Sequence, residues 1–133
     1  MLFRSLSNTE IRLMIPERSD ARLSDLSTSS FLGDMLEAGV RVFKYQTGML
    51  HSKAIVIDDL ISIVGSTNID DRSFKQNFEV NAFIYDDKTA LQLKKLFIDD
   101  MANCTELTLD GWNNRRRRQK LKESFARLFS PLM

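Results

Sequence analysis

Two short apolar runs, framed by polar side chains, constrain the fold of this chain more than any other feature. Ala54–Ile57 and Leu60–Val64 are each long enough for a β-strand and too short for a typical helix. Asp58 and Asp59 stand between the runs, and adjacent aspartates are typical of a turn. The sequence therefore predicts a β-hairpin, or two neighbouring strands, over residues 54–64.

Polar residues gather at the outer ends of these two predicted strands. His51 and Lys53 are two positions apart on the approach to the first strand, so their side chains are expected to point the same way. The second strand ends in Gly65-Ser66-Thr67-Asn68, where small and hydrogen-bonding residues let backbone approach an anion closely. An imidazole, an ammonium group and an amide at adjacent strand ends predict a compact phosphate site.

The remaining segments alternate between predicted strands and helices. Apolar periodicity predicts strands over 10–15, 40–45 and 76–85. It predicts helices over 28–38, with Gly39 as the helix stop, from Asp86-Asp87 as N-cap to about Asn103, and over about 114–130. Residues 69–75 are interpreted as a polar loop and 105–114 as a linker. No segment is left over for a second domain, so residues 1–133 are expected to form a single α/β domain.

Composition excludes several classes of protein. The formal net charge of the 133 residues is +1, which does not favour a protein that coats nucleic acid. Cys104 is the single cysteine, so no internal disulfide is possible, and a buried thiol in a reducing compartment is expected. No run approaches the roughly 18 apolar residues of a membrane span, and the N-terminus shows no signal-peptide pattern.

The polar residues around the hairpin have the spacing His-x-Lys-x4-Asp-x6-Gly-Ser-x-Asn, which resembles the HKD signature of the phospholipase D superfamily. Every fixed position is filled, by His51, Lys53, Asp58, Gly65, Ser66 and Asn68. An isolated His-x-Lys would be interpreted as an ordinary histidine beside a solvated lysine, but six matches in register favour the functional interpretation. The resemblance implies a phospholipase D-like α/β/α sandwich with a mixed β-sheet, containing one HKD half.

The flanking sequence is similar to that of bacterial cardiolipin synthases. The similar stretches are residues 36–46, 68–74, 77–80 and 128–132, and the likeness covers the chain from about Ile11 to Leu132. Members of that family carry two HKD halves in one chain, preceded by hydrophobic segments. No second His-x-Lys occurs here, so the chain is expected to correspond to the second, C-terminal half.

The resemblance implies a role for each of six residues. It implies catalytic roles for His51, Lys53 and Asp58, and phosphate binding by Lys53, Ser66 and Asn68. It also implies that Glu79 supports a catalytic histidine by accepting a hydrogen bond from it. It implies no metal ion or other cofactor, because lysine and histidine cations from two copies neutralise the phosphate.

Three of these roles have alternatives. Asp58 is equally well explained as a turn-forming or structural aspartate. Ser66 either donates to phosphate or closes the turn, and Glu79 without the resemblance is a solvent-facing strand residue.

The implied reaction is transfer of a phosphatidyl group between two phosphatidylglycerol molecules through a phosphohistidine. It requires a second HKD half, either a missing N-terminal half or the mate in a homodimer, and it implies peripheral contact with the bacterial cytoplasmic membrane. In the complete enzyme His51 is expected to be the general acid. Two alternatives stay open: a homodimeric phospholipase D-like nuclease, and an inactive half-domain that binds phosphate, lipid or a partner.

The C-terminal segment has two interpretations. Arg115–Arg118 is either a solvated helix start or a group attracted to anionic lipid. Phe125, Leu128 and Leu132 follow at helical spacing and either pack on the sheet, which we favour, or enter a membrane interface.

Overall fold

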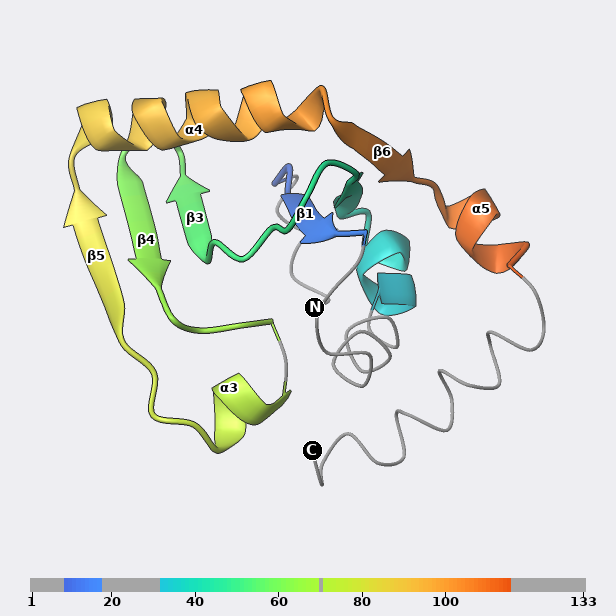
Figure 1. Ribbon diagram of the computed structural model, residues 1–133, viewed down its shortest axis with the longest axis horizontal. Helices are drawn as coiled ribbons and strands as arrows, with labels where there is room; N and C mark the ends of the chain where they lie inside the picture. The colour runs from blue at the N-terminus through green and yellow to red at the C-terminus, as the bar shows by residue number, and fades with distance from the viewer. Residues whose placement is uncertain (1–8, 18–31, 70, 116–133) are drawn as a thin grey trace. The chain divides into compact units, whose positions relative to one another are not determined.

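The computed structural model in Figure 1 describes residues 9–17, 32–69 and 71–115. The described residues belong to two compact units, which are treated separately below. The first contains the described residues of Met1–Leu50 and Cys104–Met133, and the second is His51–Asn103.

The first unit is built on a mixed three-stranded sheet. Its strands are β1 (Arg12–Pro16), β2 (Arg41–Tyr45) and β6 (Cys104–Leu107). The central strand β2 pairs in parallel with β1 and antiparallel with β6. A helix over 32–37 and α5 (Leu109–Asn113) complete the described part of this unit.

The helix over 32–37 ends at a glycine in the left-handed region. Gly39 has φ +76°, a conformation that glycine adopts without a Cβ penalty. Its backbone N–H donates to Leu36 O at 2.9 Å, and Val40 N–H donates to Met35 O at 2.9 Å. This pair of bonds is a Schellman motif, which turns the chain directly into β2.

The core of the first unit lies between the sheet, the helix over 32–37 and α5. Its buried apolar side chains are Leu32, Met35, Leu36, Val40, Val42 and Trp112. Thr108 caps α5 by accepting a hydrogen bond from Gly111 N at 3.1 Å, which positions Trp112 in that core.

The second unit is an antiparallel three-stranded sheet with two helices. Its strands are β3 (Ala54–Ile57), β4 (Ile61–Gly65) and β5 (Asn81–Tyr85), in the order β3-β4-β5. Its helices are α3 (Asp71–Lys75) and α4 (Asp87–Met101). Figure 1 shows the three strands side by side with α4 crossing one end of them, and α4 contacts β3 and β4.

The turn between β3 and β4 has an unusual backbone. Asp58 and Asp59 have φ of 49° and 58°, and Leu60 N donates to Ile57 O at 3.1 Å. Positive φ at both central residues is the signature of a type I′ turn, whose twist suits an antiparallel hairpin. Lys94 of α4 holds this turn through an ion pair with Asp59, with Nζ 2.7 Å from Oδ2.

The two faces of the second sheet differ in burial. Ser62, the second residue of β4, is fully buried and is paired in register with Val56 and Ile84. Because side chains alternate along a strand, this row lies on the face that α4 covers, where Ala90 is also fully buried. Ile55 and Phe83 belong to the opposite face and are more than half exposed.

The hairpin, four other predicted elements and one predicted cap are present. Strands β2 and β5 and helix α4 lie within their predicted ranges, and β1 extends one residue past its predicted end, to Pro16. Asp86 caps α4 by accepting from Thr89 N at 2.8 Å. The strand predicted from residue 76 begins only at Asn81. The predicted helix over 114–130 lies almost wholly outside the described residues, as does the start of the one over 28–38.

Two predictions of irregular structure were wrong. The segment interpreted as a polar loop contains the five-residue helix α3, and the expected linker contains both β6 and α5. Strand β6 exists because it pairs with β2. Across this pair, the Arg41 guanidinium donates two hydrogen bonds, of 2.8 and 3.0 Å, to the Glu106 carboxylate. Such pairing is not visible in four residues of sequence. Cys104, expected to be buried, is half-buried in β6.

Candidate functional site

Three segments of the chain meet at one end of the second sheet. The chain enters β3 and β5 at the end where it leaves β4, because both neighbours run antiparallel to β4. Gly65 N donates to Lys53 O at 3.1 Å, and Ser66 N donates to Val80 O at 3.0 Å. These bonds bring the residues before β3, those after β4 and those before β5 into one cluster.

His51 and Lys53 occupy the segment before β3. His51 is exposed and Lys53 is half-buried. The Lys53 ammonium donates to His51 O at 2.8 Å, so the lysine side chain is folded back over the histidine backbone. An ammonium group has three donors, so it can bind an anion beside the imidazole while it keeps this bond.

Ser66 and Glu79 join the end of β4 to the approach to β5. The Ser66 hydroxyl donates to Glu79 Oε2 and accepts from Val80 N at 3.0 Å. Asn77 Nδ2 donates to the other carboxylate oxygen, Oε1, at 3.2 Å. The hydrogen bond from Ser66 lowers the pKa of Glu79 most, followed by those from Ser73 and Asn77. Desolvation raises the pKa by less than these bonds lower it, and the Lys53 charge makes the smallest contribution, a further lowering. Glu79 is therefore a carboxylate at neutral pH.

This geometry bears on two expected roles. The hydrogen bonds described for Glu79 come from Ser66, Ser73 and Asn77, so its support of His51 stays a prediction. Phosphate binding by Ser66 also stays a prediction. To donate to phosphate, the Ser66 hydroxyl must give up the hydrogen bond that it donates to Glu79. Asn68 follows this cluster directly and is exposed, as a ligand for an anion must be.

Sequence reasoning missed a second pair at the same end of the sheet. Thr67 and Asn81 exchange two side-chain hydrogen bonds, of 2.8 and 3.1 Å. Thr67 occupies the variable position of the signature, and Asn81 lies within the strand predicted over 76–85. The signal that could have found them is the register, which sets Asn81 opposite Gly65.

The structure does not bring Asp58 to this cluster. Asp58 lies in the turn after β3, so the whole of that strand separates it from His51 and Lys53. Four residues of strand span roughly 13 Å. The position supports the turn-forming alternative, and a catalytic role for Asp58 stays a prediction without support from the geometry.

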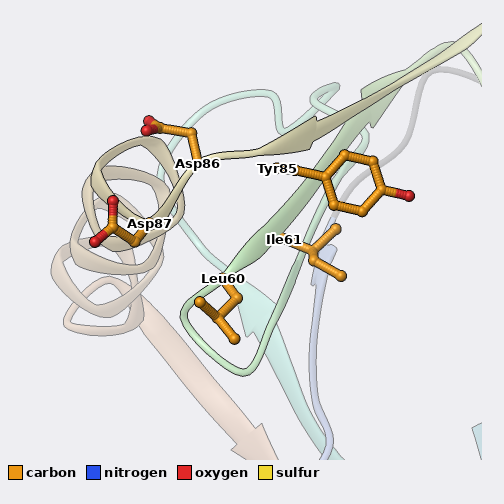
Figure 2. A pocket seen from close by; sticks show the side chains of 5 residues that line it. All are labelled: Leu60, Ile61, Tyr85, Asp86 and Asp87. Atoms are coloured by element: carbon orange, nitrogen blue, oxygen red, sulfur yellow. The ribbon is translucent and has the colours of Figure 1, made fainter.

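A hollow lies at the turn end of the sheet rather than at the cluster. Leu60, Ile61, Tyr85, Asp86 and Asp87 line it, and Figure 2 shows the two aspartates at the start of the helix beside three mainly apolar side chains. The Asp86 carboxylate accepts from Thr89 N and Oγ1, so it is occupied in capping α4. None of the six signature residues lines this hollow.

The described residues contain neither a metal-binding cluster nor a membrane-spanning helix. Among residues 9–17, 32–69 and 71–115, no group of three or more His, Cys, Asp or Glu side chains is placed to hold a metal ion. None of the helices described in those ranges has the length and apolar character needed to cross a bilayer.

A six-residue signature gathered mostly at one end of an antiparallel sheet defines a phospholipase D-like domain. Residues 4–101 match the family model described as "Cardiolipin synthase, PLD-like domain". The match covers more than half of the chain, and the chain belongs to this family.

Curated relatives agree with the family match. The chain is 45% identical over 129 residues to a cardiolipin synthase of Staphylococcus aureus strain Mu50, and this covers 97% of the chain and 26% of the relative. It is 42% identical over 129 residues to cardiolipin synthase 2 of Staphylococcus epidermidis strain RP62A, with the same coverage. The chain thus spans about a quarter of the length of the curated relatives it matches.

A solved structure confirms the expected fold class. The chain resembles Nuc from Salmonella typhimurium, a phospholipase D family member, with a TM-score of 0.64 over 80% of this chain and 70% of that one. Sequence identity is 16%, so this likeness shows the phospholipase D-like α/β fold alone.

Proposed function

We propose that this chain is the C-terminal catalytic half of a cardiolipin synthase-like phosphatidyltransferase. The observation that carries the proposal is the clustering of His51, Lys53 and Asn68 at one sheet end, in a chain 45% identical to a cardiolipin synthase. The reaction transfers a phosphatidyl group from one phosphatidylglycerol to the hydroxyl of another, giving cardiolipin and glycerol.

The clustered residues fit the needs of phosphodiester exchange. The reaction requires a nucleophile, neutralisation of the non-bridging phosphoryl oxygens, and a proton for the leaving alkoxide. Lys53 supplies positive charge and Asn68 supplies amide donors to these oxygens. Histidine titrates near neutral pH, so His51 can transfer a proton or attack phosphorus.

The complete site needs a second imidazole, because this chain contains one histidine. We propose that a second HKD half supplies it, either from an N-terminal half or from a second copy of this chain. The imidazole of that half attacks phosphorus, the bond from phosphorus to the glycerol oxygen breaks, and His51 gives its proton to the departing oxygen. The hydroxyl of the second phosphatidylglycerol then displaces the histidine, and His51 takes back the proton from that hydroxyl.

The substrate implies where the protein acts. Phosphatidylglycerol is an anionic lipid of a bilayer, so the proposal includes peripheral contact with the cytoplasmic membrane of a bacterium. Arg115 stacks on the Trp112 ring at 3.8 Å. This contact occupies one of the basic residues that were considered for lipid attraction.

The test measures cardiolipin formed from phosphatidylglycerol vesicles, together with the oligomeric state by sedimentation. His51→Asn is expected to abolish cardiolipin formation, and Lys53→Ala to reduce it strongly. Lys95→Gln is the matched control, because among the described residues the Lys95 side chain makes an exposed ion pair with Asp99, within α4. A His51→Asn chain as active as the wild type contradicts the proposal. A wild-type dimer that forms no cardiolipin contradicts the version in which a second copy of this chain supplies the other half.

A homodimeric nuclease is the second candidate, and the presence of one HKD motif in 133 residues favours it. Two copies related by a twofold axis would bring two His51 side chains to one site. Cleavage of DNA by the dimer, falling steeply with salt, would favour this candidate over the lipid enzyme.

A further inference from the structure

The side chains of Thr67 and Asn81 form a closed pair across the end of the sheet. Thr67 Oγ1 donates to Asn81 Oδ1 at 3.1 Å, and Asn81 Nδ2 donates back to Thr67 Oγ1 at 2.8 Å. Since each side chain both donates and accepts, the pair fixes the direction of the hydroxyl and of the amide together.

Gly65 makes room for this pair. In the register of the sheet, Gly65 lies opposite Asn81. A Cβ atom on Gly65 would be 2.0 Å from Asn81 Oδ1 and 2.4 Å from Val80 O, far inside van der Waals contact. The amide of Asn81 therefore lies where a side chain at position 65 would be, and it reaches across this space to Thr67.

Asn68 follows two consecutive residues that are each held to the segment leading into β5. Ser66 is bonded to Glu79 and to Val80, and Thr67 is bonded to Asn81. The exposed Asn68 side chain thus extends from a short segment whose preceding residues are fixed by two separate contacts.

We propose that Thr67 and Asn81 are positioning residues that hold Asn68 in place to bind the substrate phosphate. The inference rests on the proposed function, in which Asn68 is a phosphate ligand. Without the pair, the residue before Asn68 loses its side-chain contact with β5, and Asn68 must be ordered when phosphate binds. That ordering reduces the affinity for phosphate.

The test uses the full chain and inorganic phosphate, followed through the imidazole resonance of His51. That resonance is unambiguous, because His51 is the one histidine in the sequence. Thr67→Val and Asn81→Ala are each expected to weaken phosphate affinity roughly threefold to tenfold, which is the usual effect of one neutral hydrogen bond. Thr67→Ser keeps the hydroxyl and should bind phosphate as the wild type does.

The double variant separates a shared contact from two unrelated effects. If Thr67 and Asn81 act through each other, Thr67→Val with Asn81→Ala should bind phosphate about as well as either single variant. Urea unfolding of each variant is the control for folding. A loss of stability with unchanged phosphate affinity of the folded chain overturns the inference and leaves the proposed function intact.

Failure of the proposed function gives a different pattern. A wild-type His51 resonance that does not respond to phosphate, or an Asn68→Ala chain that binds phosphate normally, removes the phosphate site on which the inference rests. Wild-type affinity in both Thr67→Val and Asn81→Ala, with Asn68→Ala impaired, overturns the positioning role alone.

Discussion

The hydroxyl of Ser66 donates a hydrogen bond to the carboxylate of Glu79, thirteen residues further along the chain. The same hydroxyl accepts from Val80 N, so one small side chain serves two residues of the neighbouring segment. The serine of the signature is thus already engaged in holding the candidate site together, and the acid it holds responds to pH.

Glu79 is expected to make part of the stability depend on pH. Its pKa lies below the ordinary 4.5, first because Ser66 donates to the ionised form. A lowered pKa in the folded state gives stabilisation that is present above pH 4.5 and is lost as pH falls through the folded value. Urea unfolding of the wild type and Glu79→Gln should therefore differ most near neutral pH and converge in acid.

Ser66→Ala tests the cause of this effect. Removing the hydroxyl removes the largest contribution to the lowered pKa, so Ser66→Ala should reduce the pH dependence that Glu79 contributes. Other carboxyl groups with lowered pKa values, such as Asp86 and Glu106, are present in all three chains. Their contributions to the pH dependence of stability therefore cancel in the comparison. A difference between wild type and Glu79→Gln that is the same at every pH contradicts this explanation.

Asp58 should behave as a turn residue. Its φ of 49° is unfavourable for a residue with a side chain, so Asp58→Gly is expected to raise the free energy of unfolding by about 0.5–1 kcal/mol. Asp58→Val should lower the free energy of unfolding by about 1–2 kcal/mol, because a β-branched residue tolerates the left-handed backbone region poorly. Urea unfolding measures both changes.

The phosphate response of His51 supplies the functional control for Asp58. Because Asp58 and His51 are separated by the length of β3, Asp58→Gly should bind phosphate normally and should not alter turnover. Loss of turnover in a well-folded Asp58→Gly chain would restore the catalytic role that the signature implies.

Gly65→Ala should be among the most damaging single-methyl changes in the second unit. Its Cβ would overlap both the Asn81 amide and the Val80 carbonyl oxygen, which belongs to the backbone. We expect a loss of about 1–3 kcal/mol in unfolding free energy and weaker phosphate binding. Gly111→Ala, whose Cβ would meet only the Thr108 hydroxyl at 3.1 Å, is the comparison.

The clash at Gly65 also predicts that a second substitution, at Asn81, restores little of the lost stability. Adding Asn81→Ala to Gly65→Ala removes the amide but leaves the Val80 carbonyl 2.4 Å from the new methyl group. The double variant should therefore stay less stable than Asn81→Ala alone. Equal stability of these two chains would mean that the backbone of β5 moves aside without cost.

Ser62 carries a hydroxyl that the fold does not use. It is fully buried in β4, and among the described residues its Oγ has no hydrogen-bond partner. Replacing an unpaired buried hydroxyl with hydrogen removes a desolvation cost, so Ser62→Ala should be neutral or more stable by up to about 1 kcal/mol. Thermal unfolding tests this, and a large loss of stability would show that the hydroxyl has a partner.

The sequence predicted the elements whose signals are local. The hairpin followed from two apolar runs around Asp58 and Asp59, and the start of α4 followed from the capping aspartate at Asp86. The helix stop at Gly39 was likewise visible, because a left-handed residue after an apolar helix favours glycine. Each of these depends on a few neighbouring residues.

Elements that depend on distant partners were missed. Strand β6 owes its existence to β2, sixty residues earlier in the chain, and no periodic pattern in Cys104–Leu107 marks it. The same limit applied to the site: His51, Lys53 and Asn68 were found by their spacing, whereas the pairing of Thr67 with Asn81 depends on the register. Cross-strand contacts of this kind are set by tertiary structure rather than by local sequence.

The hairpin turn lies a strand's length from His51 and Lys53, and this separation makes it an attachment point for a reporter group. A fluorophore on a cysteine introduced at position 58, with Cys104 replaced by serine, would label the chain at a single place. The label would lie at the opposite end of β3 from His51 and Lys53 and would contact neither of them. Association with vesicles or with a second HKD half is then expected to change the emission of the label.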